Sequence, residues 1–159
     1  MNRLGCDVQV RSHPGRIFCY NSAVNKYTDQ DARAGLSEKL PAIETFANQF
    51  PDYEIMIEIP EFTSVCPKSG LPDFGVLTVR YQPARRVLEL KSLKEYLLAY
   101  RNLGIFYENV VNRVLEDIVR ACRPVRASVT GEFNPRGGVK SVVVARYPRS
   151  GKRPRRTRD

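Results

Sequence analysis

The spacing of apolar residues changes period along this chain, and the order of these changes is the strongest constraint on its fold. Apolar and polar residues alternate over 55–59 and again over 75–81, which is the pattern of strands with one buried face. The two runs predict an antiparallel pair of strands joined by a long loop.

From about residue 90 to residue 122 the apolar residues instead recur every three or four positions, which predicts amphipathic helices. A break at Asn102-Leu103-Gly104 divides this stretch into two helices. Alternation returns over 125–130 and 139–146, and the Asn-Pro-Arg-Gly-Gly run at 134–138 predicts a hairpin between them.

The order strand, strand, helix, helix, strand, strand predicts an α+β domain with a four-stranded antiparallel sheet and both helices on one face. We assign this domain to residues 51–146. Residues 1–50 are interpreted as an extended arm with a short helical turn near 40–46, and residues 147–159 as a basic disordered tail. Exposed sheet edges favour association of subunits into a larger barrel, because an unpaired edge tends to pair with another chain.

The composition indicates a cytoplasmic protein of one domain, because 159 residues can bury a real hydrophobic core. No apolar run approaches the roughly 20 residues of a membrane span, and no apolar segment resembles a secretory signal. Four scattered cysteines and a single histidine argue against a metal site and indicate a reducing compartment.

The net charge of +9 is concentrated in residues 146–159, which contain seven Lys or Arg residues and one Asp. The remaining residues carry a net charge of only +3. The tail could hold RNA through phosphate contacts, or it could serve only as a solvated end. The predicted domain itself is only mildly basic.

The loop between the first two predicted strands carries Cys66 and, seven residues later, Asp73. Two prolines and two glycines restrict this loop. A thiolate is a strong nucleophile, and a nearby carboxylic acid can give or take the proton that such chemistry moves. The alternative is a buried structural cysteine and an aspartate in a turn, which the residue types alone favour.

Two further segments complete a recognisable pattern. An E-x-K-x-x-K run begins at Glu89, and residues 133–138 read Phe-Asn-Pro-Arg-Gly-Gly. Together with the Cys66 loop, in this order and spacing, they resemble the NADPH-dependent 7-cyano-7-deazaguanine reductases, the QueF nitrile reductase family in its single-domain type. The resemblance runs from about residue 59 to residue 138.

The resemblance implies a tunnelling fold (T-fold), whose subunits join their sheets into a barrel and bind ligands between neighbours. Single-domain members form decamers of two stacked pentamers. The implied reaction belongs to queuosine biosynthesis, a tRNA modification pathway. Cys66 would attack the nitrile of 7-cyano-7-deazaguanine to form a covalent thioimide, Asp73 would act as acid and base, and two NADPH would complete reduction to 7-aminomethyl-7-deazaguanine.

The resemblance also implies the binding residues. Those lining the deazapurine site would be Leu88, Glu89, Leu90, Tyr107 and Glu108, and those meeting NADPH would be Lys91, Lys94, Arg136 and Gly137. Without the resemblance, these cations would be interpreted as a solvated helix face and a hairpin tip. The family usually has a histidine at the position of Tyr107, and a tyrosine, with a reference pKa of about 10, carries protons poorly near neutrality.

Two other functions stay open. An amidinotransferase like archaeosine synthase would add ammonia to the same nitrile on tRNA; the basic tail and the missing histidine favour this reading, and the retained cofactor cations oppose it. A non-catalytic T-fold protein would bind a purine or pterin without turnover.

Overall fold

The computed structural model of the chain describes residues 9–12, 16–19 and 27–149. Residues 150–159 of the predicted disordered tail, their contact with RNA, and most of the predicted arm before residue 27 lie outside these described residues. Residues 147–149 of that tail are described: Tyr147 ends a strand, and Nη2 of Arg149 lies 3.0 Å from Oε1 of Glu116.

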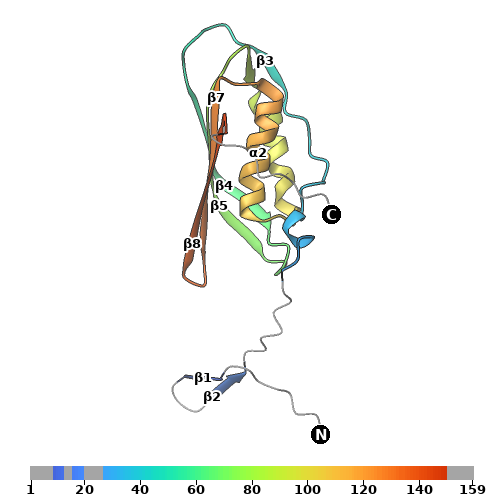
Figure 1. Cartoon of the computed structure of the whole chain (residues 1–159), viewed down its shortest axis with the longest axis vertical. Coiled ribbons are helices and arrows are strands. Elements are labelled where there is room, and N and C mark those ends of the chain that lie inside the picture. The colour runs from blue at the N-terminus through green and yellow to red at the C-terminus, as the bar shows by residue number, and fades with distance from the viewer. Residues whose placement is uncertain (1–8, 13–15, 20–26, 150–159) are drawn as a thin grey trace.

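The main sheet has four antiparallel strands in the order β4-β5-β7-β8. These strands are β4 (Ile55–Val65), β5 (Pro72–Gln82), β7 (Arg126–Arg136) and β8 (Val139–Tyr147), and the helices are α1 (Leu90–Leu98) and α2 (Tyr107–Cys122). Both helices cover one face of the sheet (Figure 1). The order of strands and helices predicted from the period changes is therefore confirmed.

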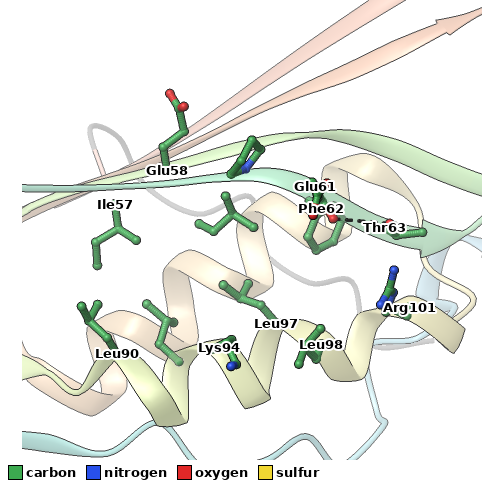
Figure 2. A pocket seen from close by; sticks show the side chains of 13 residues that line it. Ile57, Glu58, Glu61, Phe62, Thr63, Leu90, Lys94, Leu97, Leu98 and Arg101 are labelled. Carbon is green, nitrogen blue, oxygen red and sulfur yellow. Dashed lines mark hydrogen bonds between the residues drawn. The ribbon is translucent and has the colours of Figure 1, made fainter.

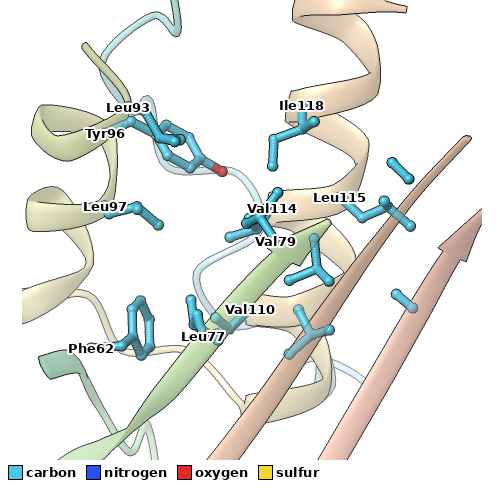
Figure 3. Packing of buried hydrophobic residues seen from close by; sticks show 14 of the residues in the cluster. Phe62, Leu77, Val79, Leu93, Tyr96, Leu97, Val110, Val114, Leu115 and Ile118 are labelled. Atoms are coloured by element: carbon cyan, nitrogen blue, oxygen red, sulfur yellow. The ribbon is translucent and has the colours of Figure 1, made fainter. Parts of the chain in front are cut away.

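The hydrophobic core fills the space between the two helices and the covered face of the sheet (Figure 3). Leu77 and Val79 point into it from β5, and Val110, Val114 and Ile118 from α2, and each of these side chains is 0% exposed. Burying one such aliphatic side chain is worth about 1.5–3 kcal/mol, so this layer fixes how the helices lie on the sheet.

The hairpin between β7 and β8 is confirmed, with a shorter turn than the sequence indicates. β7 continues to Arg136, which pairs with Val139. Only Gly137 and Gly138 remain for the turn, at φ of +55° and +81°, values that residues with a Cβ rarely adopt. The turn therefore holds Arg136 at the end of a strand.

A small second sheet replaces the helical turn predicted near residues 40–46, which was wrong. β3 (Thr45–Ala47) pairs antiparallel with β6 (Arg86–Leu88). The Nε of Arg86 also donates to Oγ1 of Thr45 at 2.9 Å, so pairing with a distant segment outweighs the weak local pattern. The alternation predicted from residue 125 starts one residue later in the structure, because β7 begins at Arg126 and Val125 is 55% exposed.

The remaining elements are short. β1 (Gln9–Ser12) pairs with β2 (Arg16–Cys19), and two 3-10 helices, η1 (Asp31–Arg33) and η2 (Ala99–Asn102), lie in connecting segments. Within the described ranges, no helix is long and apolar enough to span a membrane. The same residues contain no group of three or more His, Cys, Asp or Glu side chains placed to hold a metal ion.

Candidate active site

Cys66 lies directly after β4, in a loop closed by its own backbone. The Cys66 N–H donates to the Leu71 carbonyl at 2.9 Å, and the Gly70 N–H donates to the Cys66 carbonyl at 2.9 Å. Val65, the last residue of β4, exchanges backbone hydrogen bonds with the segment after η2, donating to Leu103 and accepting from Ile105. The sequence predicts a rigid loop here, and these contacts provide it.

The surroundings of Cys66 favour its thiolate. Burial acts to raise the pKa of the thiol, but hydrogen bonds from the Ser69 hydroxyl and N–H, the Lys68 N–H and the Arg136 guanidinium outweigh it and hold the pKa below its usual value. A thiol with a lowered pKa and partial exposure is a better nucleophile at neutral pH than an ordinary buried cysteine.

Asp73 lies in β5, and its side chain is buried, with only 4% exposed. Its Oδ1 atom accepts from the Tyr107 hydroxyl at 2.6 Å and lies 2.6 Å from Nη2 of Arg136. Among the described residues, no hydrogen bond reaches the other carboxylate oxygen, Oδ2. One oxygen of Asp73 is therefore fixed by two donors, and the other is left available for a proton.

Arg136 joins the two halves of this cluster. Its Nη2 donates to the Pro72 carbonyl at 2.6 Å, in addition to its contacts with Asp73 and Cys66. Arg136, at the end of β7, thus contacts the Asp73 carboxylate and the Pro72 backbone, and its charge acts on the Cys66 thiol. The predicted contact of Arg136 with NADPH stays a prediction.

Tyr107 is the first residue of α2 and presents its hydroxyl to Asp73. Its ring stacks on Phe133 with 3.8 Å between centroids and 11° between planes. Burial and the neighbouring Asp73 carboxylate raise the pKa of Tyr107 to about 12, so it keeps its proton near neutrality and acts as a hydrogen-bond donor. Tyr107 therefore orients Asp73.

Ser64 is a residue that the sequence analysis did not assign to the site. It lies opposite Asp73 in the β4–β5 register, and both are buried on the same face. Its hydroxyl is the one buried side-chain polar atom in the described part of the chain without a hydrogen-bond partner. The signal was present, because Ser64 shares the inward parity of Phe62 and a polar residue at such a position is unusual.

The second group of predicted site residues lies at the far end of α1. The Leu88 side chain is in the core at 2% exposure, and the Glu89 carboxylate caps the helix by accepting from the N–H groups of Lys91 and Ser92 at 2.8 and 2.7 Å. These bonds lower the pKa of Glu89. The sequence analysis missed this capping role.

The two groups are not brought together within one chain. Glu89 precedes the first turn of α1, whereas the Cys66 loop contacts the segment after η2, which follows the last turn. The nine residues of α1 alone span about 13 Å at 1.5 Å per residue. Glu108, by contrast, lies beside Tyr107 in the first turn of α2, and its carboxylate is exposed.

Comparisons with known proteins bear on this arrangement. A model of the QueF-like protein family matches residues 72–152. The chain is 61% identical over 122 residues to the NADPH-dependent 7-cyano-7-deazaguanine reductase of Elusimicrobium minutum, a match that covers 76% of this chain and 92% of the relative. The chain belongs to the QueF-like protein family. The reductase of Chlorobaculum tepidum is 56% identical over 110 residues, or 68% of this chain and 94% of that protein.

A solved structure also resembles this QueF-like chain. The archaeosine synthase QueF-Like, in its apo form, aligns with a TM-score of 0.59 and 26% identity, covering 64% of this chain and all of that one. The similarity in three dimensions agrees with the α+β arrangement of antiparallel strands and two helices.

A groove of about 420 Å³ runs between α1 and β4, the edge strand of the QueF-like domain (Figure 2). Its walls are largely apolar, with Leu90 and Leu97 among the lining residues from α1 and Ile57 among those from β4. Lys94, a predicted NADPH ligand, lines it together with Arg101, which the sequence analysis did not assign to the site. Glu58 and Glu61 of β4 also line the groove, which therefore places charged side chains of both signs beside an apolar surface.

Proposed function

We propose that this chain reduces the nitrile of 7-cyano-7-deazaguanine to the primary amine 7-aminomethyl-7-deazaguanine, in queuosine biosynthesis, with two NADPH and through a thioimide on Cys66. The observation that carries the proposal is the placement of Arg136, whose guanidinium lies 2.6 Å from the buried Asp73 carboxylate and also lowers the pKa of the Cys66 thiol. Relatives 61% and 56% identical are named NADPH-dependent 7-cyano-7-deazaguanine reductases.

The first step needs only residues of this chain. The Cys66 thiolate forms a bond to the nitrile carbon while one π bond of the nitrile breaks, and the nitrogen takes a proton. Oδ2 of Asp73, the oxygen that Tyr107 and Arg136 leave unoccupied, takes the proton released by the Cys66 thiol and passes it to that nitrogen. The Arg136 guanidinium, still bound to Oδ1, stabilises the carboxylate that this transfer leaves.

NADPH, when bound, supplies the two hydrides, and two protons complete the conversion of a nitrile to an amine. The residues near α1 fit a dinucleotide, because Lys91 and Lys94 are exposed and Lys94 and Arg101 line an apolar groove. Cationic side chains suit the phosphates, and an apolar wall suits a flat ring. After the first reduction the carbon–sulfur bond breaks, and the thiolate of Cys66 leaves with the bonding pair.

The deazapurine would contact residues of two copies of the chain. Glu108 is exposed at the Cys66 end and would accept from ring N–H groups, whereas the Leu88–Leu90 segment lies at the other end of α1. The edges of β4 and β8 have no strand partner among the described residues, which supports closure of several sheets into a barrel. A decamer of two pentamers is the assembly that the family resemblance implies.

An amidinotransferase is the second candidate, because the solved archaeosine synthase QueF-Like resembles this fold at 26% identity. A non-catalytic binder is the third. Intact-protein mass spectrometry after mixing with 7-cyano-7-deazaguanine separates them: we expect an adduct that disappears in Cys66→Ala, whereas a binder forms none.

Adding NADPH then separates the two enzymes. We expect oxidation of two NADPH for each nitrile consumed. Incorporation of ammonia into nitrile-bearing tRNA without NADPH oxidation, by a well-folded protein, would instead support the amidinotransferase.

A further inference from the structure

Residues 27–38, which we call the strap, fold back onto the catalytic end of the domain. The Asn109 side chain in α2 donates to the Ala32 carbonyl at 2.8 Å, and the Arg113 guanidinium donates to the carbonyls of Gly35 and Glu38. The first two turns of α2 thus hold the strap by its backbone. The sequence predicts an extended arm here, but this part of it packs on its own domain.

The strap also packs closely against the segment that supports the Cys66 loop. Gly35 has φ of +73°, and a Cβ atom there would lie 2.7 Å from the Gly104 carbonyl oxygen and 2.7 Å from Cβ of Ile105. Ile105 in turn donates its N–H to the Val65 carbonyl, one residue before Cys66. Residues 104–105 therefore lie between the strap and the end of β4, from which the Cys66 loop begins.

One side chain of the strap reaches the loop directly. Asp31 lies 2.9 Å from Nζ of Lys68, and the two side chains are 29% and 24% exposed. Thr28 fixes the same carboxylate, because its N–H and hydroxyl both donate to Oδ2 at 2.8 Å. Nζ of Lys68 also lies 5.0 Å from the ring centroid of Tyr27. Lys68 is thus held by two strap residues.

We propose that the strap is a positioning device for the nucleophile, and that Asp31 is its positioning residue, acting through Lys68 on the loop that carries Cys66. The inference rests on the proposed function only in taking Cys66 as the nucleophile. Lys68 is the second residue after Cys66, and its backbone N–H lowers the pKa of the thiol. Fixing the Lys68 side chain to Asp31 therefore restrains the amide that stabilises the thiolate.

The ion pair is formed throughout the range in which such an enzyme works. Hydrogen bonds from Lys68 and Thr28 lower the pKa of Asp31 to about 2, so its carboxylate is charged at neutral pH. The groups that influence the Cys66 thiol are Ser69, Lys68 and Arg136, and Tyr107 lies close enough to feel its charge. Only Lys68 among these is tied to the strap.

The test uses three variants: Asp31→Asn, Lys68→Met and the double variant that combines these two changes. Asp29→Asn is the control. Asp29 is exposed two residues away and makes no hydrogen bond or ion pair with other described residues, so Asp29→Asn is a matched control for loss of charge. The readout is the rate of Cys66 alkylation by iodoacetamide as a function of pH, followed on the Cys66 peptide by mass spectrometry. Peptide resolution is needed because the chain has three other cysteines.

We expect Asp31→Asn and Lys68→Met each to raise the pH midpoint of alkylation and to slow alkylation at neutral pH about three- to tenfold. The double variant should be no slower than the slower single variant, because both remove the same link. Asp29→Asn should match the wild type.

Two results would overturn the proposal. Wild-type alkylation in folded Lys68→Met, which leaves the Thr28–Asp31 contacts in place, would show that the link does not restrain the loop. Faster alkylation in Asp31→Asn, abolished by adding Lys68→Met, would show that Asp31 only masks the charge of Lys68. Alkylation requires neither nitrile nor NADPH, so its outcome is separate from the success of the reductase assignment.

Discussion

The two ends of α1 differ in how completely one chain builds them. At the Cys66 end, Asp73 lies 2.6 Å from both the Tyr107 hydroxyl and the Arg136 guanidinium, and Arg136 also lowers the pKa of the Cys66 thiol. At the Glu89 end, Lys91 and Lys94 are exposed and the groove beside them is open to solvent. The comparison indicates that one chain by itself orders the cluster around Cys66 and Asp73 but leaves the Glu89 end exposed.

The largest effect expected from breaking the preorganised end is that of Asp73→Asn. Asparagine keeps the size of the side chain and can still accept from Tyr107 and Arg136, but it cannot donate an acidic proton to the nitrile nitrogen. We expect thioimide formation to slow by about 10²- to 10⁴-fold, measured as the rate of adduct appearance by mass spectrometry.

Glu132→Gln is a suitable control for Asp73→Asn, since Glu132 is an exposed acid of β7 that pairs with Lys140 at 3.0 Å. It should form the adduct at the wild-type rate. An Asp73→Asn enzyme that forms the thioimide as fast as the wild type would remove Asp73 from the first step.

A pair of cation variants tests the division between the two ends. Arg136→Met should raise the pKa of Cys66, slow its alkylation and lower kcat about ten- to a hundredfold, because it removes the donor shared by thiol and acid. Lys94→Met should raise the KM for NADPH about tenfold and leave alkylation unchanged. If Arg136→Met changes only the KM for NADPH, Arg136 belongs with the cofactor cations, as the family resemblance implies.

The two ends also differ in what the sequence could predict. Periodicity predicts β4, β5, α1, α2, β7 and β8, because each buries one regular face. The Cys66 loop predicts a Cys–Asp pair, but the sequence did not predict that Arg136, assigned to NADPH by the resemblance, contacts Asp73. The strap and the β3–β6 pair were not predicted. They depend on contacts such as Asp31 with Lys68, 37 residues apart, and not on any local pattern.

Tyr107→Phe measures a smaller contribution at the preorganised end. The variant keeps the ring that stacks on Phe133 and removes only the hydroxyl that donates to Asp73. Loss of one hydrogen bond to a charged group is worth about 1.5–3 kcal/mol, so kcat should fall about tenfold or somewhat more. Because the pKa of Tyr107 is about 12, the shape of the pH–rate profile near neutrality should not change. A lost inflection in that range would show that Tyr107 itself titrates during turnover.

Ser64→Ala should have the smallest effect on kcat. It tests whether a polar residue buried beside Asp73 lowers the stability of the fold. The hydroxyl is buried without a partner in the described structure, so its removal should raise the free energy of unfolding by about 1 kcal/mol, measured by urea denaturation. Since Ser64 lies opposite Asp73, we expect kcat to fall by a small factor at the same time. Ser141→Ala is the control, because Ser141 lies on β8 away from Asp73 and should change neither quantity. If Ser64→Ala is instead less stable than the wild type, the Ser64 hydroxyl has a hydrogen-bond partner in solution. Ser64 would then be a candidate third donor to Asp73, besides Tyr107 and Arg136.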